Sequence, residues 1–100
     1  MASYSKVKSK HWTLTGNQVD DLTLTGYYRW VELYNRTPDT EVFYTYGNSS
    51  SVPADPAVDG DNTDVVAGGS SVRFEVKQAN TVLKVKSTGT PKVSVSGSSV

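Results

Sequence analysis

The chain has no cysteine, one histidine and one methionine among its 100 residues. Without cysteine there is no disulfide, no thiolate metal site and no cysteine nucleophile, so packing and hydrogen bonds must stabilise the fold. No segment repeats apolar residues at the i, i+3, i+4, i+7 spacing of an amphipathic helix. A chain of this length has room for one domain with one core. We therefore expect residues 1–100 to form a single all-β domain.

Long apolar runs are also missing from the sequence. None approaches the roughly 20 residues that span a bilayer, and the N-terminal segment MASYSKVKSK lacks the apolar centre of a signal peptide. These features predict no membrane partner and a mature chain that begins at Met1 in the cytoplasm. Export would then require another route, such as the release of assembled particles when a cell lyses.

The chain has no excess of either charge, with ten basic and ten acidic residues. A neutral domain lacks the general attraction for phosphate on which non-specific nucleic-acid binding depends, so we expect no nucleic-acid partner. The charges are nevertheless segregated, with lysines near both ends and only acidic residues between Pro38 and Ser71. Such segregation suits complementary surfaces on neighbouring copies. It fits solvated loops that share one sign equally well.

Aromatic residues are concentrated in one stretch, Tyr27 to Tyr46, which holds seven of the ten in the chain. Its composition predicts two strands, 28–34 and 42–46, joined by a polar turn at 35–39. Both faces of these strands carry large apolar groups. One face should lie on the core and the other against a second copy, another protein or a covering loop. Alternatively, the rings only fill the core and its margins.

Six further strands are predicted from alternating apolar and polar residues between Gly, Pro, Asn and Asp turns. They cover residues 4–14 after a short arm, 19–25, a short segment near 63–67, 72–77, 82–86 and 92–96. The small and acidic residues from Gly47 to Gly69 predict a long loop. About eight short strands with no substantial helix indicate a two-sheet antiparallel β-sandwich or jelly roll.

No pattern in the sequence points to catalysis or to a cofactor. His11 has no partner at a recognisable spacing, and nucleophile-elbow, phosphate-loop and zinc-protease motifs are absent. We therefore expect a surface or interface histidine and no enzyme. Asp59, Asp61 and Asp64 place oxygen ligands at alternating positions, as calcium loops do. The pattern departs from a calcium loop at Gly60 and at Ser70, so it also fits a plain Asp/Asn turn.

Three stretches resemble small β-sandwich structural proteins encoded in the virion gene clusters of tailed bacteriophages. They are VELYNRTPDTEVFYTYG (Val31–Gly47), DVVAGGSSVRFEV (Asp64–Val76) and VLKVKSTGTPKVSVSG (Val82–Gly97). Such sequences have a strand ending in an Asn-Arg turn, an aromatic strand, a Gly/Asp loop, an Ala-Gly-Gly turn and a final hairpin around Ser-x-Gly-Thr-Pro. The resemblance covers about residues 19–97 and leaves the possible contact arm, residues 1–10, outside it.

The resemblance implies a virion component without catalysis, most like a capsid decoration (cement) protein on the outer capsid surface. Its implied partner is the major capsid protein, and such proteins often form trimers. Related sandwiches in tails and head fibres imply the alternative of a module that binds a host receptor or glycan. We predict lattice contacts at Lys6, Lys8, Lys10, His11 and Trp12, and contacts between copies at Tyr27, Tyr28, Trp30, Tyr34, Tyr44 and Tyr46.

Overall fold

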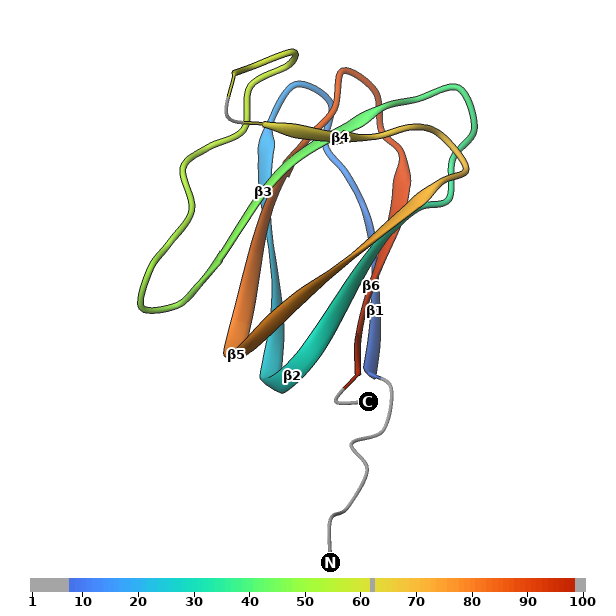
Figure 1. Cartoon of the computed structure of the whole chain (residues 1–100). Coiled ribbons are helices and arrows are strands. Elements are labelled where there is room, and N and C mark those ends of the chain that lie inside the picture. The colour runs from blue at the N-terminus through green and yellow to red at the C-terminus, as the bar shows by residue number, and fades with distance from the viewer. Residues whose placement is uncertain (1–7, 62, 99–100) are drawn as a thin grey trace, which may run out of the picture.

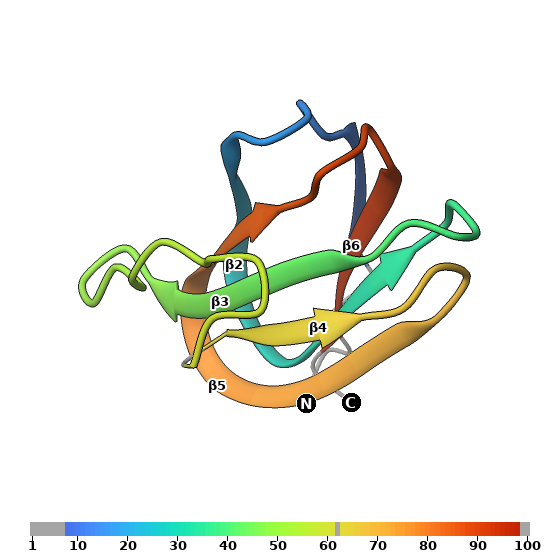
Figure 2. The same ribbon diagram turned by 90° about the horizontal axis from the view of Figure 1, so that it is seen from above.

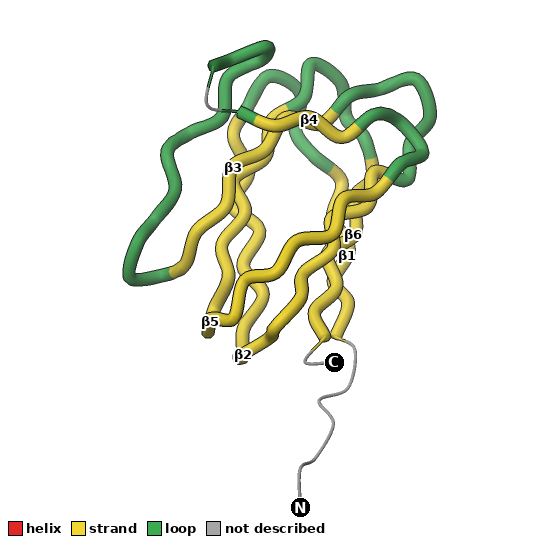
Figure 3. Tube along the Cα trace, viewed as in Figure 1, coloured by secondary structure: helices red, strands yellow, loops and turns green. Residues whose placement is uncertain are grey.

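The computed structural model describes residues 8–61 and 63–98. Within these ranges the chain forms one antiparallel sheet with the order β1-β6-β2-β5-β3-β4, and no helix. The strands are β1 Lys8–Thr13, β2 Val19–Asn35, β3 Val42–Asn48, β4 Asp64–Val66, β5 Ser71–Lys86 and β6 Lys92–Ser98. The sheet curls into a half-barrel (Figures 1 and 2), and most of the loops lie at one end of it (Figure 3). The all-β prediction is confirmed.

The curl comes from a bend in the two longest strands, β2 and β5, which pair with each other along most of their length. Gly26 has a φ of 115° and Asn80 a φ of 55°, and the Gly26 N–H donates to Asn80 Oδ1 at 3.1 Å. The register between the strands shifts between Leu24 and Tyr27 and again between Tyr28 and Trp30. Such bulges bend a strand without ending the ladder.

The bend divides the sheet into two halves that face each other. The β3 half contains β3, β4, residues 19–24 of β2 and residues 81–86 of β5, and the β6 half contains β1, β6, residues 27–35 of β2 and residues 71–79 of β5. Both halves contribute to one buried core, made of Leu14, Leu22, Leu24, Tyr28, Val31, Leu33, Val42, Tyr44, Val66, Leu83, Val85, Val93 and Val95.

The predicted eight strands in two sheets are not confirmed. The predicted strands 19–25 and 28–34 form one strand, β2, and the predicted strands 72–77 and 82–86 form one strand, β5. At both predicted breaks, Gly26 and Asn80 adopt positive φ while their strands remain paired. The sequence therefore marked two bends rather than two ends. The short strand expected near 63–67 is present as β4, and the first strand is described from Lys8.

At four of the five connections, two strands that follow each other in the chain are separated in the sheet by another strand, and two of these connections bear on the predicted fold. β5 lies between β2 and β3, and β2 lies between β5 and β6. The prediction of a final hairpin around Ser-x-Gly-Thr-Pro is therefore wrong. β5 and β6, the strands on either side of this segment, do not pair with each other, because β2 lies between them. The two connections are tied together instead: the Lys92 N–H donates to Thr37 Oγ1 at 2.8 Å, and the Ser87 hydroxyl donates to the Glu41 carbonyl at 2.7 Å.

Candidate binding surface

The predicted contact residues differ widely in burial. Tyr28 and Tyr44 are only 7% and 4% exposed and belong to the core, and the half-buried Trp12 packs against it. Lys6 and the side chain of Lys8 lie outside the described residues. The others reach the surface at least in part: Lys10, His11, Tyr27, Trp30, Tyr34 and Tyr46. The predicted set is thus partly core and partly surface.

The position of Tyr28 departs from simple alternation along the predicted strand 28–34. Simple alternation places Tyr28 on the same face as Trp30 and Tyr34, but the register shift between Tyr28 and Trp30 separates them. Tyr28 is buried with Val31 and Leu33 in the core. Trp30 and Tyr34 remain on the opposite face, which we call the outer face of the β6 half, and Tyr34 is 40% exposed there.

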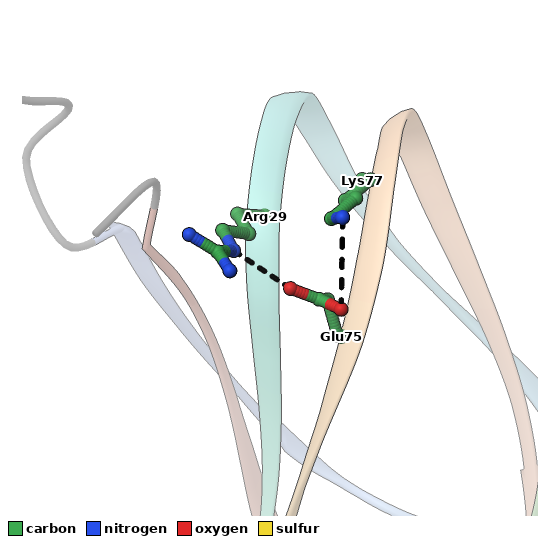
Figure 4. Close-up of polar contacts among 3 residues, drawn as sticks. All are labelled: Arg29, Glu75 and Lys77. Carbon is green, nitrogen blue, oxygen red and sulfur yellow. Dashed lines mark hydrogen bonds and ion pairs between the residues drawn. The ribbon is translucent and has the colours of Figure 1, made fainter.

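Charged groups surround Trp30 on this outer face. The Arg73 guanidinium lies 4.5 Å from the Trp30 ring centroid and that of Arg29 lies 5.6 Å away, within the range of cation–π attraction. Arg29 Nε also donates to Glu75 Oε2 at 2.7 Å, and Lys77 Nζ lies 3.9 Å from Glu75 Oε1 (Figure 4). The hydrogen bond from Arg29 lowers the pKa of the Glu75 carboxyl.

A row of small hydroxyl groups continues the outer face across β6 onto β1. Ser94 and Ser96 pair with Tyr34 and Glu32 of β2 on one side, and with His11 and Ser9 of β1 on the other. His11 Nδ1 lies 2.7 Å from Ser94 Oγ. The imidazole therefore has a hydroxyl partner that sequence spacing did not reveal. This exposed contact provides hydrogen-bonding groups beside Tyr34, the β2 partner of Ser94.

A second aromatic group lies on the core side of the sheet, where side chains of β3 meet one from the first part of β5. The Tyr46 and Phe74 rings stack with centroids 4.2 Å apart, and the Tyr44 ring lies 6.0 Å from Phe74. Tyr46 is 44% exposed, and burial raises the pKa of the Tyr44 phenol, with a further contribution from the Asp64 carboxylate. Tyr27 is 60% exposed at the bend. The exposed tyrosines thus lie at separate places on the molecule.

The acidic stretch is partly used within the fold. Asp55 Oδ1 accepts a hydrogen bond from Lys84 Nζ at 3.0 Å, which raises the pKa of Lys84. The Thr45 hydroxyl donates to the Ala54 carbonyl, and Pro56 is buried. These contacts hold the β3–β4 loop against β3 and β5. Asp55 therefore acts as an internal ion-pair partner rather than as part of a uniform acidic surface.

The described part of the chain contains no detected pocket. Among the same residues, no group of three His, Cys, Asp or Glu side chains could hold a metal ion, so Asp59, Asp61 and Asp64 do not form a ligand set. No helix in residues 8–61 and 63–98 is long and apolar enough to cross a membrane. The structure thus offers surfaces, rather than an enclosed site, as candidates for function.

Sequence analysis missed several residues of the outer face. Arg73 and Glu75 surround Trp30, and the β6 serines connect it to His11. Alternation in 72–77 and 92–96 already indicated that these side chains share a wet face of their own strand. It could not show that β2 lies between β5 and β6, which brings them to Trp30.

Comparisons of this chain with protein-family models, with curated protein sequences and with solved structures found no match.

Proposed function

We propose that this protein is a non-enzymatic virion component of a tailed bacteriophage that decorates and stabilises the capsid by binding major capsid subunits. It would be made in the cytoplasm of the bacterial host and act on the outer capsid surface. Support comes from three stretches that resemble small β-sandwich structural proteins of tailed bacteriophages: Val31–Gly47, Asp64–Val76 and Val82–Gly97. These stretches include the end of β2, much of β5 and most of β6, strands that build the outer face of the β6 half.

The observation that carries the proposal is the composition of this outer face. Trp30 lies beside two arginines, and the 40% exposed Tyr34 lies four residues further along β2. Tryptophan, tyrosine and arginine are enriched at protein interfaces and dominate their binding energy. On a capsid the same small contact repeats many times, so a modest affinity per copy is enough if the copies are linked. A homo-oligomer serves that purpose, and the resemblance favours a trimer.

We also propose that the curled sheet is a variant of the two-sheet sandwich that the sequence suggests. Its β3 half and β6 half would act as two layers, with β2 and β5 passing from one to the other. This is supported by the single core to which both halves contribute. The outer face of the β6 half would then correspond to the exposed face of one layer.

Co-sedimentation with capsids that lack the protein tests the proposal. Saturable binding at a fixed ratio to the capsid subunit is expected, and the ratio reports which symmetry axes are occupied. Tyr34→Ala should weaken binding about tenfold, the loss of one moderate interface residue. The control is Val65→Ala, which truncates a 50% exposed side chain on β4, in the β3 half. Absence of binding by the unmodified protein would contradict decoration, and equal effects of both variants would contradict the assigned face.

The arm is tested by the same assay. Deleting residues 1–7 removes the part of the predicted arm that precedes β1 in the sequence and leaves Lys8–Thr13 in place. If the arm holds the lattice as predicted, the deletion should reduce binding at low ionic strength more than at high, because Lys6 contributes positive charge. Unchanged binding would show that Lys6 and the other residues of this segment are not lattice contacts.

The second candidate is a tail or head-fibre module that binds a receptor glycan. The observation in its favour is that Trp30 and Tyr34 share the outer face with the hydroxyls of Ser94 and Ser96, an arrangement of rings and hydrogen-bonding groups that suits a sugar. A glycan screen with and without calcium tests this candidate. Glycan binding that Tyr34→Ala abolishes, combined with no binding to capsids, would replace the first proposal.

A further inference from the structure

One edge of the curled sheet differs from the others in its lack of protection. In the described chain, residues 71–79 of β5 pair with β2 on one side, and no strand pairs with them on the other. Exposed edges invite pairing with another chain, and soluble proteins commonly prevent it with short edge strands, covering loops or charged side chains that point inward. We compared the edges of this sheet for these features.

The other edges each have such a feature. On β1, the exposed Lys10 pairs with the buried Val95 and lies on the core side of the sheet. On residues 19–24 of β2, Asp20 lies on the same side as the core residues and accepts a hydrogen bond from the Thr15 N–H at 3.0 Å. β4 is only three residues long. The end of β3 is covered by its own loop, through reciprocal backbone bonds between Asn48 and Ser51.

The edge of β5 has no inward charge within residues 71–76. Val72, Phe74 and Val76 lie on the core side and are only half-buried, while Arg73 and Glu75 lie on the outer face. These three apolar side chains stay partly exposed because no neighbouring strand covers them on the open side. An added strand with apolar residues at matching positions would complete the cover.

Backbone geometry determines which groups would pair with an added strand. The Asn35 N–H donates to the Ser70 carbonyl at 2.9 Å, and hydrogen-bonded pairs recur at every second position of an antiparallel ladder. Val72 and Phe74 therefore direct their backbone groups toward β2. Ser71, Arg73 and Glu75 direct theirs away from β2, toward the open edge.

From this arrangement we propose that two copies of the chain pair edge to edge through β5, antiparallel and centred on Phe74. In this register Arg73 of each copy lies opposite Glu75 of the other as a hydrogen-bonded pair, and Val72 lies opposite Val76. Centring on Arg73 or Glu75 instead places like charges opposite each other, which destabilises a sheet. Arg73, Phe74 and Glu75 all lie in a segment of β5, Ser71–Glu75, that pairs with β2 without a register shift.

The aromatic group beside β5 supports the same centre. Phe74 is stacked on Tyr46, with ring centroids 4.2 Å apart, and Tyr46 is 44% exposed. Pairing at Phe74 brings the two phenylalanines opposite each other as a non-hydrogen-bonded pair, the closer of the two kinds of pair. The exposed tyrosine of each copy is then covered by the side chains of the other.

This interface goes beyond the proposed function and does not depend on it, because it forms between copies in solution without capsids. It is a two-fold contact, whereas the resemblance implies a trimer. Sedimentation equilibrium of the full chain distinguishes these states. A concentration-dependent mass that approaches twice 10.8 kDa is expected. A monomer at all concentrations up to about 1 mM, the weak limit of useful affinity, or a trimer would overturn the proposal.

Charge exchange tests the register. Arg73→Glu places Glu opposite Glu at both pairs and should raise the dissociation constant about tenfold or more. The double variant Arg73→Glu with Glu75→Arg restores unlike charges in the same register and should recover most of the affinity. Lys92→Glu, an equal charge change at an exposed position of β6, is the matched control. If the double variant dimerises no better than Arg73→Glu while both remain folded, the register is wrong.

Two further measurements remain informative if the charge variants fold poorly. Amide exchange of the unmodified chain should slow at Glu75 as protein concentration rises, while exchange at Phe74, which already faces β2, should change much less. Val72→Lys introduces the inward charge that the other long edges have, and should give a folded monomer. Equal exchange behaviour of the two amides, or a Val72→Lys dimer as tight as the unmodified one, would contradict pairing at this edge.

Discussion

Asn35 is the buried polar residue that organises the loop end of the molecule. It is 0% exposed, and its Nδ2 donates to the Thr40 and Val66 carbonyls while its Oδ1 accepts from the Thr37 N–H. One amide thus holds the β2–β3 connection on β4. Sequence analysis placed Asn35 at the start of a polar turn, whereas it is the last residue of β2. Local turn chemistry gives no information about Val66, which is distant in sequence.

Asn35→Ala should destabilise the protein by about 2 kcal/mol, because it leaves buried carbonyl groups without a donor. The change should appear as a lower urea midpoint with an unchanged slope. Gln18→Ala, at an exposed turn position, is the control and should have little effect. Asn35→Asp keeps the acceptor for Thr37 but loses both donors, so stability close to that of the unmodified protein would show that the donors are unimportant.

The Glu75 carboxyl should titrate below its ordinary pKa, chiefly because Arg29 donates a hydrogen bond to it. A carboxyl with a lowered pKa in the folded state stabilises that state above its unfolded pKa, and the contribution is lost as pH falls through the lowered value. NMR titration of Arg29→Met should show the pKa of Glu75 rising toward the ordinary value. Lys77→Met, which removes a charge 3.9 Å away, should raise it less; a reversed order would contradict this assignment.

At the scale of elements, the bend in β2 and β5 decides the shape of the sheet. Alternation of apolar and polar residues predicted strands on both sides of Gly26 and Asn80, and these predictions are confirmed. The same turn residues were interpreted as strand ends. Glycine bends a strand, rather than ending it, when the neighbouring strand stays paired with it on both sides of the glycine. Here that neighbour is β5, which lies far along the chain.

Gly26→Ala should destabilise the fold by about 1–3 kcal/mol, because a φ of 115° is unfavourable for any residue with a Cβ. An added Cβ would also lie 3.1 Å from the Tyr28 hydroxyl oxygen. Thr23→Ala, at an exposed position of the same strand, controls for general effects of substitution in β2. Thermal unfolding measures both variants, and equal transition temperatures would show that the bend does not require glycine.

At the scale of the whole molecule, the first and last strands are neighbours. β1 lies beside β6 (Figure 1) and pairs with it. In this pairing Lys8 is the partner of Gly97. The β3–β4 connection, in contrast, has exposed residues such as Val58 and Asp59. Closeness of the described ends and an exposed loop elsewhere are the conditions under which circular permutation is tolerated.

A permutant with its original ends joined by a short Gly-Ser linker and opened between Val58 and Asp59 should fold, with a loss of about 1–2 kcal/mol for the altered loop constraint. Opening between Thr37 and Pro38 should be far more harmful, because that connection is bonded to Asn35 and Lys92. Urea unfolding compares the two permutants. Equal stability would show that the contacts of the β2–β3 connection contribute little.

Much of the local structure followed from residue order. Alternation with a period of two, the absence of a helical stripe and the turn residues were enough to predict an all-β chain, the positions of its strands and the long acidic loop. The face of each side chain was also predictable within β6, where no bulge intervenes. The same alternation gave the wrong face for Tyr28, because one register shift in β2 moves every preceding side chain to the opposite face.

The pairing of strands was decided by the tertiary structure. In the order β1-β6-β2-β5-β3-β4, most strands lie beside partners from distant parts of the chain. Such pairings form together when the sheet folds. For this reason the outer face around Trp30 and the open edge of β5 became visible only in the folded chain. The residues that form them come from strands whose adjacency no local pattern encodes.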